Sequence, residues 1–114
     1  MDSTEKKYRI FTTSEFDQDY ERLDNSEKER VKKIISRLKI QGGSVGKPLS
    51  TNYFREKKLN GKRLYFLVYI EYNVVLAVAI SDKKAQQATI NQILSDLLYY
   101  QKYVLEELKK RGLI

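Results

Sequence analysis

The chain contains no cysteine and no histidine, and these two absences exclude several classes of chemistry. Without cysteine there is no disulfide, no thiol nucleophile and no thiolate metal site, which is typical of an intracellular, cytoplasmic protein. Without histidine there is no Ser-His triad, no histidine acid–base pair and no ordinary zinc site. Catalysis would therefore have to use other side chains, and the sequence predicts neither a metal nor a cofactor.

Long hydrophobic runs are also missing. The longest one, Leu64 to Ile70, is far too short to cross a membrane. The first ten residues, MDSTEKKYRI, lack the apolar core of a secretory signal. No repeat, low-complexity segment or linker rich in proline and glycine interrupts the 114 residues. We therefore expect a single domain spanning residues 1–114.

Positive charge is abundant and unevenly distributed. The net charge is +7, but the segment from Lys28 to Arg63 contains twelve cations and only two acids, a local charge of +10. The segment from Ser14 to Asp24 instead contains five acids and one arginine. A basic half beside an acidic patch favours a polyanionic partner, most often nucleic acid. A solvated, lysine-rich surface that only promotes solubility is the alternative.

Hydrophobic periodicity predicts the order β-α-α-β-β-β-α and an α+β fold, in which a helical hairpin packs on a small twisted antiparallel sheet. Ser14 and Ser26 are the expected N-caps of the two hairpin helices, and Gly42-Gly43 is the expected end of the second. The other expected elements are strands at 8–12 and 74–80, a strand hairpin around residue 60, and a long C-terminal helix at about 85–111.

The C-terminal helix is too long for a domain of this size. Some 25 residues would extend nearly 40 Å at about 1.5 Å per residue, whereas the radius of gyration should be only about 13 Å. We expect that the helix bends or breaks, near Asp96, or that it overhangs and forms a surface for a partner or for a homodimer. For its first half, a position across the protein's own sheet is the alternative.

The stretch REKKLNGKRLYFLVYIE, residues 55–71, contains the strongest local signal. Its Asn-Gly step predicts a two-residue hairpin turn of type I′. Such a turn pairs Lys58 with Arg63 and Glu56 with Tyr65. The following turn has either two residues, which would place Asp82 opposite Arg63, or three, which would place Ser81 there.

Alternation along the second strand of this hairpin defines two faces. Leu64, Phe66, Val68 and Ile70 form an all-apolar face that the helices must cover. The other face, which we expect to look outward, carries Arg63, Tyr65, Leu67 and Tyr69 with Lys58 and Glu56 alongside. In either register of the next strand, Lys83 and Lys84 arrive at the same edge. We expect Lys62, at the turn, to be merely solvated.

Four stretches in this order resemble the RelE/ParE superfamily of toxins from type II toxin–antitoxin systems: YRIFTTSEFDQDYERL, GKPL, LNGKRLYFLVYIE and VVLAVAISDKK. They span residues 8–84, about two thirds of the chain. The segment KKAQQATINQI and the long helix after it look more like the HigB-type branch than short RelE.

The resemblance to RelE implies a ribosome-dependent endoribonuclease that cleaves mRNA without a metal, inhibits translation and is neutralised by a cognate acidic antitoxin. It implies catalytic roles for Arg63 and Lys58, with Lys57 adjacent, and for Lys84 or Lys83. Two features depart from the RelE pattern. The stretch AQQATI, with Ile90, stands where RelE-like members often have a catalytic tyrosine, and the terminal arginine is a lysine.

Cleavage of RNA by its own 2′-hydroxyl requires a base, charge neutralisation at the phosphorane and an acid for the leaving oxygen. The Arg63 guanidinium suits bidentate phosphate contact. Neighbouring cations favour the neutral amine of a lysine, so Lys58 is a candidate base or acid. Glu56 is the other candidate base, or else it forms a salt bridge with a nearby cation.

Tyr65 and Tyr69 are candidate binding residues that could stack on a base, or else they pack within the sheet. Two alternatives to an RNase remain open. One is a ParE-like toxin that binds DNA gyrase. The other is a degenerate member that binds RNA or a protein without cleaving.

Overall fold

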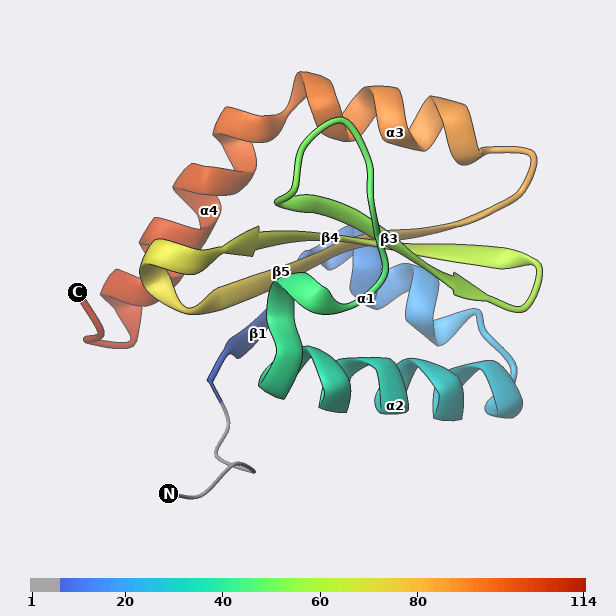
Figure 1. Cartoon of the computed structure of the whole chain (residues 1–114), viewed down its shortest axis with the longest axis horizontal. Coiled ribbons are helices and arrows are strands. Elements are labelled where there is room, and N and C mark those ends of the chain that lie inside the picture. Colours follow the sequence, from blue (N-terminus) through green and yellow to red (C-terminus); the bar gives the residue numbers. More distant parts are fainter. Residues whose placement is uncertain (1–6) are drawn as a thin grey trace.

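The computed structural model describes residues 7–114, so the expectation about a secretory signal falls mostly outside this range. Within the described range, no helix is both long enough and apolar enough to span a membrane. The elements are β1 (Arg9–Thr12), α1 (Ser14–Glu21), α2 (Asn25–Gln41), β2 (Lys47–Pro48), β3 (Phe54–Leu59), β4 (Lys62–Tyr69), β5 (Val74–Asp82), α3 (Gln86–Ser95) and α4 (Leu97–Lys110), with short 3-10 turns at Gly42–Ser44 and Ile70–Tyr72 (Figure 1).

The strands form one five-stranded sheet in the order β1-β5-β4-β3-β2. The α+β class is confirmed, but the sheet is mixed rather than antiparallel, because β1 pairs with β5 in the parallel direction. The two-residue strand β2, which lies in a stretch expected to be a loop, adds to the opposite edge. Strand β5 starts with five buried residues, Val74–Val78, as its continuous apolar sequence predicts for a strand covered on both faces.

Helices cover both faces of this sheet (Figure 1). On one face α1 and α2 bury Leu64, Phe66 and Val68, as expected. On the other face α3 and α4 bury Tyr65, Leu67 and Tyr69, so the expectation that this face looks outward is wrong. The helix residues that pack there are Ile93, Tyr100, Val104 and Leu108.

The predicted break in the C-terminal helix is confirmed at Asp96. Its backbone leaves helical geometry, with φ −114° and ψ 18°, and its N–H donates to the carbonyl of Ile93 in a tightened turn. Two segments of ten and fourteen residues replace the single long helix. The break lets both segments lie on the sheet instead of overhanging it (Figure 1).

Both helices of the hairpin begin earlier than the serines suggested. The Thr13 side chain accepts a hydrogen bond from the Phe16 N–H at 3.0 Å and caps α1, while its hydroxyl donates to the Val78 carbonyl of β5 at 2.7 Å. Asp24 and Glu27 form the capping box of α2. Ser14 and Ser26 therefore lie inside the first turns. An N-cap needs extended backbone, and Thr13 and Asp24 have it.

The β3–β4 register matches the prediction, with Lys58 opposite Arg63 and Glu56 opposite Tyr65. The turn itself is not type I′, which needs positive φ at both residues. Of the two turn residues, only Asn60 has a positive φ, 56°. Between β4 and β5, a four-residue connection and an irregularity at Tyr65/Phe66 together place Ser81 opposite Arg63. That was the outcome expected from a three-residue turn, although it arises differently.

Gly42 ends α2 in a conformation that only glycine accepts easily. Its φ is +47°, and an added Cβ would overlap the Tyr8 ring. We expect Gly42→Ala to lower the free energy of unfolding by about 1–3 kcal/mol, measured by chemical denaturation. The control is Gly61→Ala, where nothing lies within 4 Å. That variant should stay within about 0.5 kcal/mol of the parent. Equal losses in both variants would contradict the packing seen here.

Tyr100 should make the fold sensitive to alkaline pH. Burial raises the pKa of Tyr100 to about 12, above the value near 10 of an unfolded chain. Its contribution is therefore complete below about pH 10 and is lost as the pH rises towards 12. We expect Tyr100→Phe, which keeps the ring, to flatten the fall of the melting temperature over this range. A Tyr100→Phe protein whose melting temperature falls as steeply as that of the parent over this range would contradict the expectation.

Candidate active site

The candidate site lies at the end of the sheet where β3 and β4 turn. Arg63 on β4 stands between Lys58 of β3 and Ser81 of β5 in the strand register. Glu56, two residues before Lys58, lies on the same face of the sheet. This face is the one that the C-terminal helices cover. Rigid paired strands therefore hold the central groups of the site.

Arg63 is largely buried, and one of its buried nitrogen atoms has no hydrogen-bond partner in the described structure. Its side chain is 12% exposed, and its Nε lies 4.0 Å from Glu56 Oε2, which is an ion pair but too long for a hydrogen bond. One terminal nitrogen, Nη1, donates to the Lys62 carbonyl at 3.2 Å. Nε is buried and has no hydrogen-bond acceptor in the described structure. Thr51 Oγ1 is likewise buried without a partner in the described structure, so the feature particular to Arg63 is its carboxylate neighbour Glu56.

Glu56 is buried beside Arg63 and contacts the start of α3. Its carboxylate is 5% exposed, and Oε1 accepts a long hydrogen bond of 3.4 Å from Gln86 Nε2. The salt-bridge alternative for Glu56 is therefore confirmed. A carboxylate held by Arg63 on one side and Gln86 on the other orients the guanidinium.

The two candidate tyrosines are buried and pack inside the fold. Tyr65 is 0% exposed, and its hydroxyl shares a 2.8 Å hydrogen bond with Ser81 Oγ. Burial raises the pKa of Tyr65 above its ordinary value. Tyr69 is buried six residues further along β4, about 20 Å from Arg63 at the usual rise per residue. Neither ring presents a face for stacking on a base, so the alternative of packing within the sheet describes both.

The candidate lysines surround this buried group from the outside. Lys58 is exposed and Lys57 is half-buried, and both line a groove on the α2 side of β3. Lys83 and Lys84 are exposed in the turn that joins β5 to α3. That turn is fixed by a 2.8 Å hydrogen bond from the Ala85 N–H to Asp82 Oδ1. The structure therefore places all four lysines at the same end of the sheet, as expected.

Two other cations of the hairpin have separate tasks. Arg55 is 9% exposed and donates hydrogen bonds to the carbonyls of Val45, Gly46 and Asn52. These three hydrogen bonds hold the loop between α2 and β3. Lys62 donates to Glu27 Oε2 at 2.7 Å, so the expectation that it is merely solvated is wrong. This hydrogen bond holds the pKa of Glu27 below its ordinary value. It also ties the β3–β4 turn to the start of α2.

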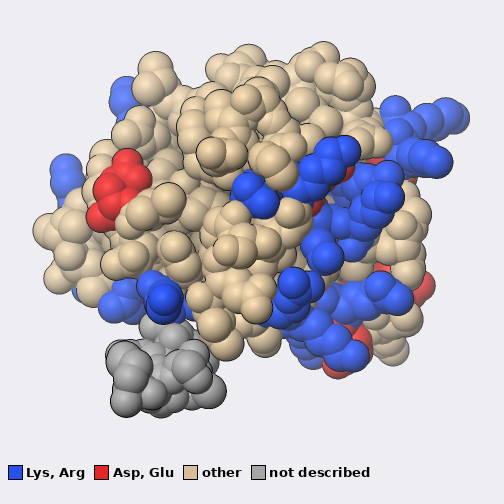
Figure 2. Space-filling model, in the orientation of Figure 1, with Lys and Arg blue, Asp and Glu red and all other residues tan. Residues whose placement is uncertain are grey.

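Positive charge dominates this side of the molecule. Figure 2 shows lysine and arginine side chains gathered over the region where the β3–β4 turn and α2 lie, with few acids among them. Among residues 7–114, no three histidine, cysteine or acidic side chains cluster as metal ligands would. The surface chemistry available here is therefore that of amines and guanidinium groups, which contact anions.

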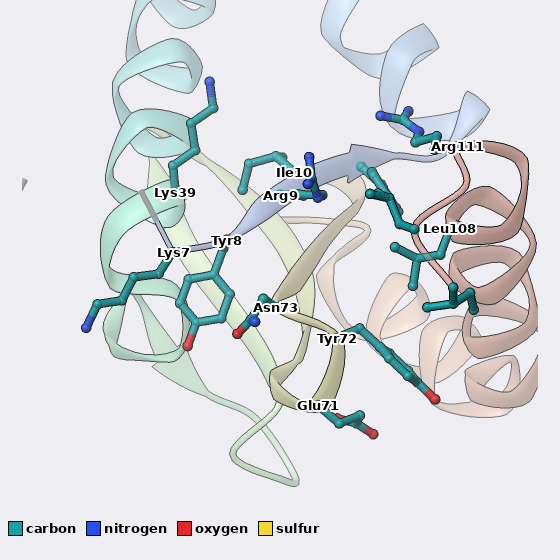
Figure 3. A pocket seen from close by; sticks show the side chains of 13 residues that line it. Lys7, Tyr8, Arg9, Ile10, Lys39, Glu71, Tyr72, Asn73, Leu108 and Arg111 are labelled. Carbon is teal, nitrogen blue, oxygen red and sulfur yellow. The ribbon is translucent and has the colours of Figure 1, made fainter. Parts of the chain in front are cut away.

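A cavity of about 710 Å³ lies away from the candidate site, and it is larger than the groove of about 440 Å³ between α2 and β3. It is bounded by the start of β1, the end of α2, the β4–β5 turn and the end of α4 (Figure 3). Lys39 and Arg111 line it together with apolar groups such as Leu108. None of the predicted site residues lines it, and the β4–β5 turn is at the opposite end of β4 from Arg63. It is thus separate from the candidate site.

Comparison with known proteins finds similarity in structure only. No family model matches the sequence, and no curated protein does. The solved RelBE2 toxin–antitoxin complex of Mycobacterium tuberculosis has a chain that is 19% identical, with a TM-score of 0.58, covering 67% of this chain and 98% of that one. A chain of the intact RelBE complex of Escherichia coli is 20% identical, with a TM-score of 0.57, covering 66% of this chain and 95% of that one. A chain of the RelB–RelE complex of Methanococcus jannaschii is 12% identical, with a TM-score of 0.56, covering 69% of this chain and 96% of that one.

The chain has the RelE fold. The resemblance read from the sequence is thereby confirmed for the arrangement of the elements. At least a quarter of this chain lies outside the matched part in each comparison, since coverage ranges from 66% to 75%. The proposed kinship with the HigB-type branch stays a prediction.

Sequence reasoning missed Gln86 and Ser81 as parts of the site. No local motif marks Gln86, because it meets Glu56 only through the tertiary contact of α3 with β3, 30 residues apart in the chain. Ser81 was available in one of the two expected registers, and its alternation with the apolar residues of β5 was the usable signal. Their hydrogen bonds to Glu56 and Tyr65 join three strands and α3 around Arg63.

The pairing of Tyr65 with Ser81 can be tested by a double-mutant cycle. Ser81→Ala leaves the buried Tyr65 hydroxyl without a partner and should cost about 1–3 kcal/mol of unfolding free energy. Tyr65→Phe should partly restore stability in the Ser81→Ala background, because both polar groups are then gone. Strictly additive losses would contradict a structural hydrogen bond here.

Proposed function

We propose that the protein is a RelE-like toxin of a toxin–antitoxin system and that it cleaves mRNA on the ribosome with no metal ion. The observation that carries this proposal is Arg63, whose guanidinium is held by Glu56 while its buried Nε has no acceptor. A cation fixed in this way beside exposed lysines is suited to the phosphate at which RNA is cut. The RelE fold supports the same assignment.

Arg63 supplies charge neutralisation in this proposal. Cleavage by the neighbouring 2′-hydroxyl adds negative charge to the phosphate oxygens as the new P–O bond forms. A guanidinium that Glu56 and the Lys62 carbonyl already orient needs little rearrangement to donate to those oxygens.

Lys58 is the proposed proton-transfer group. It is exposed and lies opposite Arg63. Glu56 is an unsuitable base, because its carboxylate is buried and engaged by Arg63 and Gln86. Removal of the 2′-hydroxyl proton by Lys58 would leave Lys84 or Lys83 to protonate the departing 5′-oxygen. Lys57 would contact an adjacent phosphate.

A cognate acidic antitoxin is the proposed partner. The solved relatives from M. tuberculosis, E. coli and M. jannaschii are complexes of a toxin with an antitoxin. The basic side of this molecule offers charge complementarity to an acidic segment that folds on binding. A homodimer through the C-terminal helix is a further proposal, supported by the exposed side chains of Leu98 and Tyr99. All of these encounters would take place in the cytoplasm.

A ParE-like toxin that binds gyrase is the second candidate. The observation in its favour is the absence of the downstream tyrosine: α3 places the half-buried Ile90 in the stretch where RelE-like members often have it. Such a protein would need the fold and the basic surface but no proton-transfer group. A non-cleaving RNA-binding member would share these properties.

The decisive experiment is mRNA cleavage on translating ribosomes, mapped by primer extension. We expect Lys58→Ala and Arg63→Lys each to reduce cleavage by about a hundredfold or more, because each removes a group that acts on the reacting phosphate. Lys58→Ala is the cleaner variant, since Lys58 is exposed and has no ion-pair partner among residues 7–114. Unchanged melting temperatures would show that the fold is intact.

The matched control is Lys102→Ala/Lys109→Ala, which removes two exposed cations from α4, away from the β3–β4 turn (Figure 1). It should cleave like the wild type. If the wild type arrests growth and the arrest persists in the Lys58→Ala/Arg63→Lys protein, the RNase proposal fails and the gyrase-binding candidate is favoured.

A further inference from the structure

A basic groove of about 440 Å³ runs between α2 and β3, on the sheet face opposite to the Glu56–Arg63 pair. One of its six lining residues is the apolar Ile34. The other five are all cations: Arg30, Lys33, Arg37, Lys57 and Lys58. The three on α2 follow i, i+3, i+7 spacing and share one helix side, where they extend over about 10 Å.

These five cations have no ion-pair or hydrogen-bond partner for their side chains among the described residues. None of them forms an ion pair or a side-chain hydrogen bond with any residue in 7–114, although other cations nearby do. Lys62, for example, is neutralised by Glu27, and Arg63 by Glu56. The side chains of Arg30, Lys33 and Arg37 are exposed. Concentrated like charge without internal partners is a cost in the free protein, and an external polyanion would relieve it.

The groove meets the candidate active site at the edge of the sheet. Strand β2 pairs only with Arg55 and Glu56, so no described strand covers β3 from Lys57 onward. Lys58 lies opposite Arg63 and also lines the groove. A polyanion could therefore pass from Arg63 around this open edge and continue along α2.

We propose that this groove binds the phosphate backbone of the RNA strand that flanks the cleavage site. The inference rests on the proposed function, since it extends the path of the same strand. Five cations around one small apolar side chain favour successive phosphates over the apolar anchors that a folding protein segment would bury. No aromatic side chain lines the groove, so it would hold the backbone with little preference for base.

The test uses fluorescently labelled 2′-O-methyl RNA, which lacks the attacking hydroxyl and cannot be cleaved. A short oligonucleotide of about three nucleotides fills the Arg63 site alone, and one of about twelve also reaches the groove. The groove variant is Arg30→Gln/Lys33→Gln/Arg37→Gln. The control is Lys102→Gln/Lys109→Gln/Lys110→Gln, which removes the same charge from α4, away from both sites.

We expect the groove variant to bind the long RNA about tenfold more weakly than the control does, and the short RNA equally well. The slope of log Kd against log salt should fall by about 2 for the long RNA, as three lost phosphate contacts predict for a single strand. Equal affinities of groove and control variants for the long RNA would overturn the groove inference. Loss of binding only to an acidic antitoxin peptide, with RNA binding intact, would overturn it as well.

The two proposals fail in different ways. If Arg63→Lys and Lys58→Ala abolish ribosomal cleavage while the groove variant binds long RNA like the control, only the groove inference is wrong. If the wild type cleaves no mRNA but the groove variant still loses affinity for the long RNA, the groove stands as an RNA-binding site and the nuclease proposal is wrong.

Discussion

The pairing of β3 with β4 is the constraint on which the rest of the molecule depends. A two-residue turn at Asn60-Gly61 sets a register in which Lys58 faces Arg63 and Glu56 faces Tyr65. Because side chains alternate along a strand, a shift by one residue would exchange the two faces. Leu64 and Phe66 would then leave the α2 core, and Arg63 would leave Glu56. The same register therefore fixes both hydrophobic cores and the candidate site.

The cations near this turn differ in which groups neutralise them, and this difference separates structural cations from those that can bind a ligand. Arg55 is satisfied by three backbone carbonyls, and Lys62 by Glu27. Arg63 has a carboxylate neighbour at ion-pair distance but keeps one buried donor free. Lys57 and Lys58 have no partner among residues 7–114. Charge count alone treats all five as equal, whereas their contacts separate two structural cations from three that are available to a ligand.

The sequence was sufficient where local rules decide the outcome. The Asn-Gly step predicted the β3–β4 register from short-range geometry. The length of the last helix, compared with the size of the domain, predicted a bend or break near Asp96 or an overhang, and the break is what the structure shows. The sequence was insufficient where distant segments meet. The alternation of β4 indicated an outward face carrying Tyr65 and Tyr69, but α3 and α4, which come later in the chain, cover that face.

The caps and turns show how neighbouring residues compete for one role. Ser26 and Glu29 have capping-box spacing, and so do Asp24 and Glu27. The structure uses the earlier pair, which places Glu27 within reach of Lys62 on the strand hairpin. Local sequence contained both possibilities, and the tertiary contact is consistent with only one. The bulge at Tyr65/Phe66 is similar, since it corrects the β4–β5 register in a way that no turn motif encodes.

The exposed edge of β3 must be kept from pairing with other chains, and the residues that prevent this pairing are also those of the proposed function. Beyond Glu56 the edge of β3 has no neighbouring strand in the described structure, and such edges invite pairing with other chains. Lysines at an edge oppose that pairing by charge and by the cost of burying them. Lys57 and Lys58 meet this need with no ligand bound. An RNA strand that crosses the edge would use the same two charges, so protection of the edge and phosphate binding require the same residues.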